Sequence, residues 1–91
     1  MGETTIITVR YWASARAAAG VAEDLLPVSG PVSLADVRRA AVDLHPDTSL
    51  AAVRAACSVL VGEHPAGTRP PEDVNVEPGE TVEFLPPFAG G

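Results

Sequence analysis

Apolar and polar positions alternate near the start of the chain, and a second β-rich segment lies near its end. In TTIITVRYW, residues 4–12, three apolar side chains share one parity: Ile7, Val9 and Tyr11. This period of two, together with the β-branched and aromatic residues, predicts a strand. Neighbours on a regular strand face opposite sides, so Tyr11 and Trp12 cannot both face the core and we expect one of them to be exposed. The segment TVEFL, residues 81–85, predicts the last strand.

A period near 3.6 in the middle of the chain predicts the main helix. Its apolar positions are three and four residues apart: Leu34, Val37, Ala41 and Leu44. Ser33 can accept a hydrogen bond from the backbone at the N-terminus, and Asp36 favours the positive end of the helix dipole. Pro46 ends the helix, because the residue before a proline is biased out of the helical region.

Turn residues divide the rest of the chain into short elements. We expect a short alanine-rich helix that ends at Gly20, where glycine takes the left-handed stop conformation. Residues 62–78 are rich in proline and polar residues, so most of this stretch is expected to be loop, with a brief strand or turn near 74–76. The other expected elements are strands over 23–28 and 58–61 and a short helix over 49–56.

These elements fit a mixed sheet packed on one main helix, because a helix with one apolar stripe must bury it against another layer. The first and last strands are the richest in β-forming residues, so we expect them to be central neighbours. They should be parallel, since the helix-containing chain between them supplies the crossover. The expected fold is therefore α+β, a β-grasp domain over residues 1–85 followed by a flexible C-terminal Gly-Gly tail over residues 86–91.

The composition narrows the classes of partner. The chain has 91 residues, with 6 basic side chains, all arginine, against 12 acidic ones, and a net charge of −6. Arginines scattered through acidic sequence do not form the basic cluster that binds phosphate backbones, so we expect no nucleic-acid partner. No apolar run approaches the roughly 18–20 residues that span a bilayer, and no targeting segment is recognisable. We therefore expect a cytoplasmic protein without a membrane partner.

The closing segment PPFAGG is the strongest candidate for chemistry. Pro86 and Pro87 cannot donate ladder hydrogen bonds, so strand pairing must end there, and an extended segment of this length reaches roughly 20 Å. Gly90 and Gly91 can enter a channel too narrow for any side chain. Phe88 lies beyond the prolines with little of its own domain to pack on, so a partner pocket and a fold-back contact both remain open.

A carboxylate at the end of this segment needs activation from outside. With a pKa of about 3.3–3.7 it is ionised at neutral pH and is a poor electrophile. The segment GEHPAG, Gly62–Gly67, lacks the lysine and the serine or threonine of a Walker phosphate-binding motif. We therefore expect no stably bound cofactor, and the ATP used for activation would sit on a partner protein.

Three other side chains are interpreted as structural. His45, at the end of the main helix, is expected to cap it or to be solvated. His64 has no third ligand at metal spacing, so no metal site is expected. Cys57 begins a strand without a histidine or lysine beside it in the sequence, and it is interpreted as a small buried hydrophobe rather than a nucleophile.

The sequence resembles the molybdopterin synthase small subunit, a ubiquitin-like sulfur carrier. The resemblance covers nearly the whole chain and rests on three segments: VRYWASARAAAG (9–20), VLVGE (59–63) and PGETVEFLPPFAGG (78–91). Two features depart from the family pattern. Val61 replaces the asparagine that commonly precedes the Gly-Glu turn, and the proline-rich stretch 65–78 is longer than usual.

The resemblance implies a ubiquitin-like β-grasp fold and a carrier cycle in which this chain is not itself the catalyst. An adenylating enzyme would convert the carboxylate of Gly91 to an acyl-adenylate, and a sulfur donor would replace AMP to leave a thiocarboxylate. The tail would then enter the large subunit of molybdopterin synthase, which holds the catalytic groups, and deliver sulfur to cyclic pyranopterin monophosphate. The tail residues that contact partners would be Pro86, Pro87, Phe88, Ala89 and Gly90.

Two alternatives stay open at this point. Sulfur carriers of the thiamine and cysteine pathways share the tail chemistry and differ in the recipient. A protein modifier that forms isopeptide bonds is the other class, although a chain without lysine could not build polymers through its own side chains.

Overall fold

The structure is a computed structural model that describes residues 5–87. One sheet has the strand order β2-β1-β7-β4-β5, and β3 pairs with β6 in a second, two-stranded sheet. The strands are β1 (Ile6–Tyr11), β2 (Glu23–Pro27), β3 (Val32–Ser33), β4 (Ser58–Val61), β5 (His64–Pro65), β6 (Asn75–Val76) and β7 (Thr81–Leu85). The helices are α1 (Ala13–Ala19), α2 (Leu34–Leu44), α3 (Leu50–Ala55) and the 3-10 turn η1 (Pro71–Asp73).

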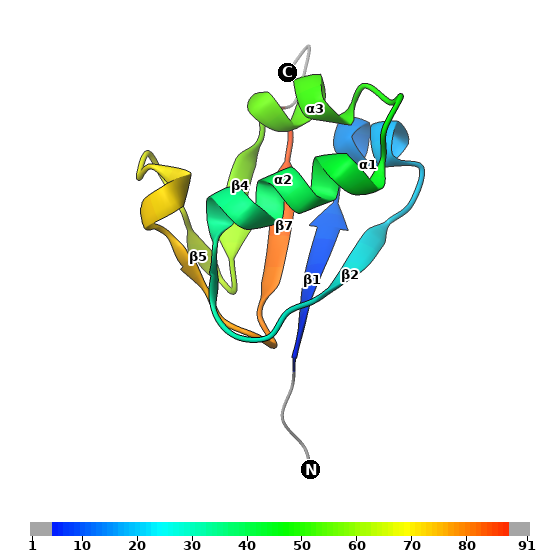
Figure 1. Ribbon diagram of the computed structural model, residues 1–91. Helices are drawn as coiled ribbons and strands as arrows, with labels where there is room; N and C mark the ends of the chain where they lie inside the picture. Colours follow the sequence, from blue (N-terminus) through cyan, green and yellow to red (C-terminus); the bar gives the residue numbers. More distant parts are fainter. Residues whose placement is uncertain (1–4, 88–91) are drawn as a thin grey trace.

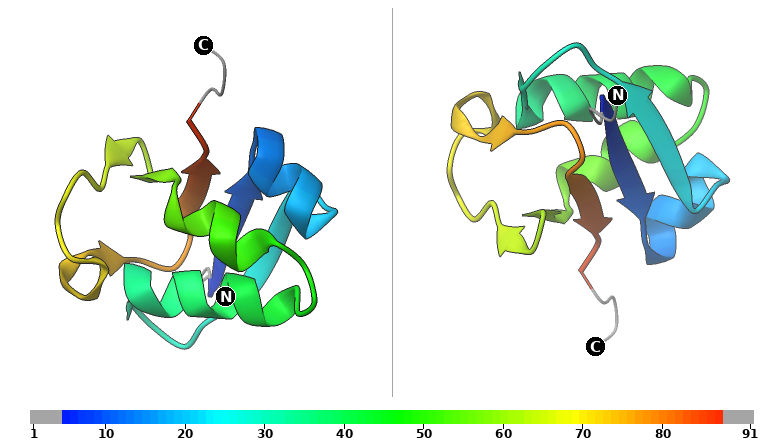
Figure 2. Two further views of the ribbon diagram at one scale, coloured as in Figure 1. Left: turned by 90° about the horizontal axis from the view of Figure 1, so that it is seen from above. Right: turned by 90° about the horizontal axis from the view of Figure 1, so that it is seen from below.

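The helices lie on one side of the larger sheet. Figures 1 and 2 show α2 crossing one face of the sheet, with α1 and α3 near the end at which β1 and β7 finish. Within residues 5–87, no helix combines the length and the apolar character needed to cross a membrane.

The first and last strands are parallel neighbours at the centre of the sheet, as the sequence predicts. Their register runs from Thr8 opposite Thr81 to Tyr11 opposite Phe84. β4 pairs with the other edge of β7 in the antiparallel sense, and β2 pairs antiparallel with β1. The mixed sheet and the main helix confirm the predicted α+β, β-grasp architecture.

The core lies between α2 and the inner face of the sheet. Leu34, Val37 and Ala41 of the predicted apolar stripe are buried, but Leu44 is 50% exposed. Leu44 was expected to be buried, and this part of the prediction is wrong. The next side chain, His45, turns toward the sheet instead and lies 2.6 Å from a carboxylate of β2.

The predicted helix ends are confirmed by their hydrogen bonds. Ser33 Oγ accepts from the backbone N–H of Asp36 at 3.1 Å and begins α2. Gly20 has φ +80° and donates its N–H to the carbonyl of Arg16, which ends α1. The expected brief strand near 74–76 is β6, whereas β3, β5 and η1 were not predicted.

Candidate functional site

The strand that leads to the PPFAGG segment is held on both of its edges. β7 lies between the parallel β1 and the antiparallel β4. Val82 and Phe84 are 0% and 1% exposed on the inner face, while Thr81, Glu83 and Leu85 lie partly exposed on the other face. Pairing on both edges fixes where the chain leaves the sheet and in which direction (Figure 1).

Two prolines follow β7 and are the last residues that the structure describes. Pro86 is buried and Pro87 is exposed, and neither belongs to a strand, as expected for residues without a backbone N–H. The remaining candidate site residues lie outside the described residues: Phe88, Ala89, Gly90 and Gly91.

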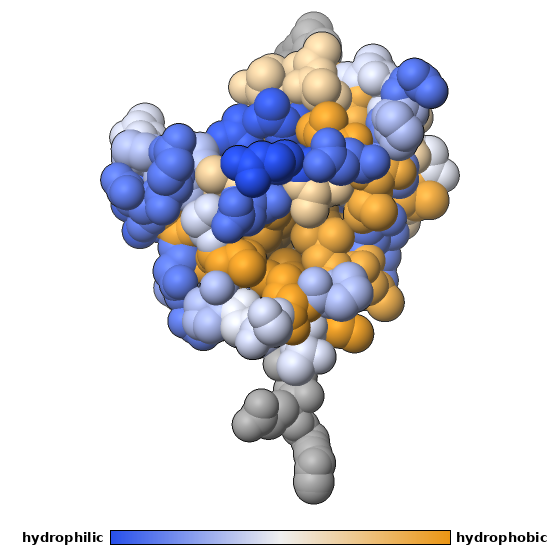
Figure 3. Space-filling model, in the orientation of Figure 1, coloured by the Kyte–Doolittle hydropathy of each residue, from blue (hydrophilic) through white to orange (hydrophobic). Residues whose placement is uncertain are grey.

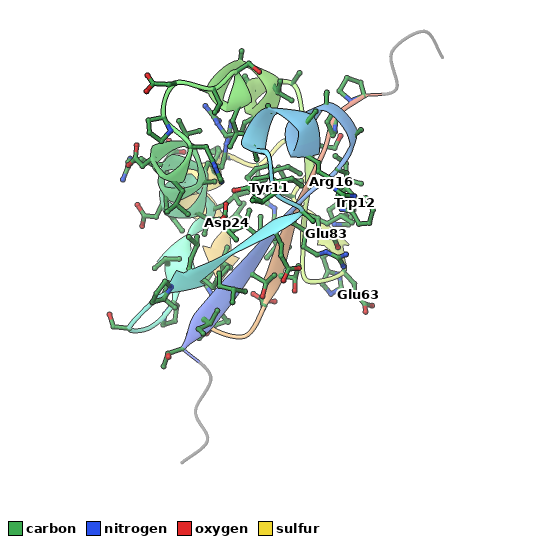
Figure 4. All side chains as sticks on the ribbon, turned by 90° about the vertical axis from the view of Figure 1, so that its right-hand side faces the viewer. Tyr11, Trp12, Arg16, Asp24, Glu63 and Glu83 are labelled. Atoms are coloured by element: carbon green, nitrogen blue, oxygen red, sulfur yellow. The ribbon has the colours of Figure 1, made fainter. Side chains whose placement is uncertain are left out.

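A cluster of aromatic and charged side chains lies beside this exit on the outer face of the sheet. Trp12, which is 40% exposed, donates from Nε1 to Glu83 Oε1 at 2.9 Å, and its backbone N–H donates to the carbonyl of Phe84 at 3.3 Å. The Arg10 guanidinium lies 5.1 Å from the centre of the indole ring, within cation–π range. Figure 4 shows Trp12 and Glu83 together, on the opposite side of the sheet from Asp24. We call Arg10, Trp12 and Glu83 the exit surface.

Tyr11 packs against the end of β7 on the inner face of the sheet. It is 2% exposed, and its ring stacks on Phe84 with centroids 6.1 Å apart. Its hydroxyl donates to Asp24 Oδ2 at 2.8 Å, and His45 Nε2 lies 2.6 Å from the same oxygen. The exposure predicted for one of Tyr11 and Trp12 is confirmed, with Trp12 on the outside.

His45 is structural rather than solvated. Its side chain is 13% exposed, its backbone N–H donates to the carbonyl of Val42 at the C-cap of α2, and its ring meets Tyr11 edge-on. Asp24 thus connects β2 to both β1 and the end of α2. Sequence reasoning missed Asp24, and the only signal for it was a carboxylate at an inward-facing position of the second predicted strand.

Replacing Tyr11 with phenylalanine is expected to lower the free energy of unfolding by about 1.5–3 kcal/mol near neutral pH, the usual range for a hydrogen bond to a charged group. Burial, followed by the hydrogen bond to Asp24 and the charge of Asp24, raises the pKa of Tyr11. Unfolded tyrosine titrates near pH ~10, so the stabilisation by Tyr11 is present below that pH and declines above it. Urea unfolding of both proteins, at neutral pH and above pH ~10, measures the difference in unfolding free energy and its change with pH. A difference between the two proteins that stays constant across this range would contradict the buried contact.

Cys57 and His64 do not form a reactive centre. Cys57 is partly buried and donates from Sγ to the carbonyl of Val53 at 3.3 Å, and burial raises the pKa of its thiol despite the nearby charges of Arg54 and Arg38. His64 is exposed in the β4–β5 hairpin. Across residues 5–87, no three His, Cys, Asp or Glu side chains gather closely enough to hold a metal ion.

Comparison with solved structures finds similar folds over nearly the whole chain. SAMP1 from Haloferax volcanii matches with a TM-score of 0.78 at 20% identity, covering 94% of this chain and 99% of that one. Urm1 from Trypanosoma brucei matches with a TM-score of 0.70 at 22% identity, covering 100% of both chains. The complex of subunits 1 and 2 of molybdopterin-converting factor from Helicobacter pylori contains a chain that matches with a TM-score of 0.63 at 16% identity, covering 94% of this chain and 99% of that one.

No protein-family model matches the sequence, and no curated protein matches it significantly. The fold and the central position of β7 define a ubiquitin-like β-grasp domain. The resemblance first seen in the sequence is thus confirmed at the level of the fold, which is shared with the small archaeal modifier protein SAMP1, with Urm1 and with a subunit of molybdopterin-converting factor.

Proposed function

We propose that this protein is a sulfur carrier of molybdopterin biosynthesis and that the carboxylate of Gly91 is the group that is loaded. The observation that carries the proposal is the exit of the chain. A central strand paired on both edges leads directly into Pro86 and Pro87, and the sequence beyond them ends in Gly90 and Gly91. A rigid domain followed by a segment without bulky final side chains suits delivery of one reactive atom into a partner's site.

Loading takes place in two steps. A carboxylate oxygen of Gly91 attacks the α-phosphate of ATP, pyrophosphate leaves, and a mixed anhydride with AMP forms on the adenylating enzyme. Hydrosulfide, or a donor equivalent to it, then attacks the acyl carbon. The bond from that carbon to the AMP oxygen breaks, AMP leaves with the electron pair, and a thiocarboxylate remains.

Transfer moves the sulfur to the acceptor without a redox step. The thiocarboxylate sulfur attacks an oxygen-bearing carbon of cyclic pyranopterin monophosphate, and the carbon–oxygen bond at that carbon breaks, with the oxygen leaving with the electron pair as water or as a freed phosphate oxygen. Water then hydrolyses the acyl–sulfur bond, which leaves the sulfur on the acceptor and restores the carboxylate of Gly91. Two such deliveries build a dithiolene. The large subunit of molybdopterin synthase would supply the groups that exclude bulk water and orient the tail. The H. pylori neighbour, solved as a complex of subunits 1 and 2, supports such a partner.

Intact-mass measurement tests the proposal directly. The protein is incubated with a candidate adenylating enzyme, ATP and sulfide, and the expected product has one oxygen replaced by sulfur. The loaded protein is then offered the large subunit with cyclic pyranopterin monophosphate, and separately the acceptors of the thiamine and cysteine pathways. Sulfur transfer to the pyranopterin alone supports the proposal, whereas transfer to another acceptor or a protein that is never loaded contradicts it.

A protein modifier is the second candidate, and the similarity to SAMP1, a small archaeal modifier protein, favours it. In this case a lysine of another protein would attack the adenylated Gly91 and form an isopeptide bond. Denaturing electrophoresis of cell extracts distinguishes the two, since a modifier produces conjugates of higher mass that remain under reducing conditions.

Replacing Trp12 with alanine is expected to weaken binding to the large subunit by about 2 kcal/mol or more, because exposed aromatic side chains dominate interface energetics. Leu25→Ala is the matched control. Leu25 is 57% exposed and lies on the edge strand β2, opposite Thr8 and away from the exit. Calorimetric titration of the unchanged protein and the two variants measures their affinity for the large subunit. Equal losses of binding free energy in both variants would mean that the exit surface does not contact the large subunit.

A further inference from the structure

Three of the six arginines line one open hollow on the helical side of the molecule. Arg38 and Arg39 come from α2 and Arg54 comes from α3, with Pro71 and Glu72 of η1 opposite, and the hollow has a volume of about 420 Å³. Figure 3 shows hydrophilic side chains gathered over α2 on this face. A concentration of cations is unexpected in a chain with a net charge of −6.

Of these three arginines, Arg54 has a buried N–H donor without a hydrogen-bond partner in the described part of the chain. Its Nε is buried, and it has no hydrogen-bond acceptor among the residues that the structure describes. Arg38 and Arg54 line the same hollow. Burial, and then the positive charge of Arg38, lower the pKa of Arg54. Arg54 as a whole is partly exposed, but a buried N–H donor without an acceptor costs free energy, and two cations from separate helices repel.

The acidic residues around the hollow do not neutralise this pair. Arg39 forms an ion pair with Asp36 at 3.2 Å. Asp43 and Glu72 also line the hollow. Nevertheless, within residues 5–87 neither Arg38 nor Arg54 lies within 4.0 Å of a carboxylate oxygen in an ion pair.

We infer that the Arg38–Arg54 hollow is a binding site for a singly charged carboxylate. The Nε edge of a guanidinium presents two parallel N–H donors that match the two oxygens of a carboxylate. Such an anion supplies the acceptor that Arg54 Nε lacks and separates the two positive charges. Asp43 and Glu72, which also line the hollow, repel a doubly charged phosphate more strongly than they repel a carboxylate. The site is independent of the sulfur chemistry assigned to Gly91.

The arginine Nε–H signals of the nitrogen-15-labelled protein, followed by NMR, report on this site. Propionate is titrated against chloride at equal ionic strength, and the Arg54 Nε–H signal is expected to move saturably with propionate only. Arg54→Lys keeps the charge but removes Nε–H. Read through the Arg38 signal, this variant should bind about tenfold more weakly, the loss of about one charge-assisted hydrogen bond.

Arg69→Lys is the matched control, because Arg69 Nε already donates to the carbonyl of Ala66 at 3.3 Å. The affinity of this variant for propionate should equal that of the unchanged protein. Arg38→Gln, read through the Arg54 signal, is a second variant in case Arg54→Lys unfolds. Equal shifts with chloride, tighter binding of inorganic phosphate than of propionate, or equal losses for Arg54→Lys and Arg69→Lys would overturn the assignment.

A blocked glutamate peptide separates the two sources of a carboxylate. Tighter binding of the peptide than of propionate assigns the site to an acidic side chain of a partner protein. Equal or weaker binding of the peptide assigns it to a small organic acid.

Discussion

Deletion of Gly91 is expected to abolish sulfur loading while leaving the thermal unfolding midpoint nearly unchanged. The last residue of the described core cluster is Phe84 and the last buried residue is Pro86, so the deletion leaves every described buried side chain in place. The loss of activity arises because the reacting acyl group would shift back by one residue, roughly 3.3–3.6 Å, and near-attack geometry tolerates far less displacement. Intact mass after incubation with ATP, sulfide and the adenylating enzyme measures loading, and calorimetry measures stability.

Two further variants sharpen this prediction. Gly90→Leu keeps the length of the chain but adds a side chain next to the reacting group, and it should also fail to load. Gly30→Ala is the matched glycine control, since a Cβ there meets no atom within 4 Å, and it should load normally. A large fall in the unfolding midpoint on deletion of Gly91, or normal loading of Gly90→Leu, would contradict a role for an unhindered acyl terminus.

Replacement of Phe84 by alanine is expected to lower the free energy of unfolding by about 3–5 kcal/mol, the usual cost of removing a large aromatic side chain from a core. Phe84 is 1% exposed on the central strand and stacks on Tyr11. A small domain has a total stability toward the lower end of about 5–15 kcal/mol. The variant should therefore be marginally folded at best, as thermal unfolding followed by circular dichroism would report.

Leu85→Ala serves as the control for this effect. Leu85 is adjacent in β7 but lies partly exposed on the opposite face, so its replacement should cost less than about 1.5 kcal/mol. Equal losses at the two positions would mean that β7 is not packed through its inner face.

The sequence predicts most of the larger elements because their signals are local. The alternation in β1, the stripe of α2 and its cap at Ser33 all depend on residues a few positions apart. The parallel pairing of β1 with β7 was also predictable, because a helical crossover between two strands favours the parallel arrangement. The strands β3 and β5, of two residues each, were missed because no periodicity can be read over such a length.

The side-chain networks depend on distances in space that no local pattern contains. Tyr11 is separated from Asp24 by 13 positions and Asp24 from His45 by 21, and only the register of β1 with β2 and the angle of α2 bring them together. Arg38 and Arg54 likewise line one hollow only because α2 and α3 lie next to each other. The candidate tail stays a prediction from the sequence, based on the covalent geometry of Pro-Pro and Gly-Gly, because residues 88–91 lie outside the described residues.

The parallel pairing of β1 with β7 has a mechanical consequence. A force applied between the start of β1 and the end of β7 acts along the two strands in opposite directions, so the ladder between them is sheared rather than peeled. In shear, the inter-strand hydrogen bonds share the load at once instead of breaking one after another. A partner that pulls on the C-terminal segment should therefore meet strong resistance to unravelling, and release of the carrier should break the interface before it unfolds the domain.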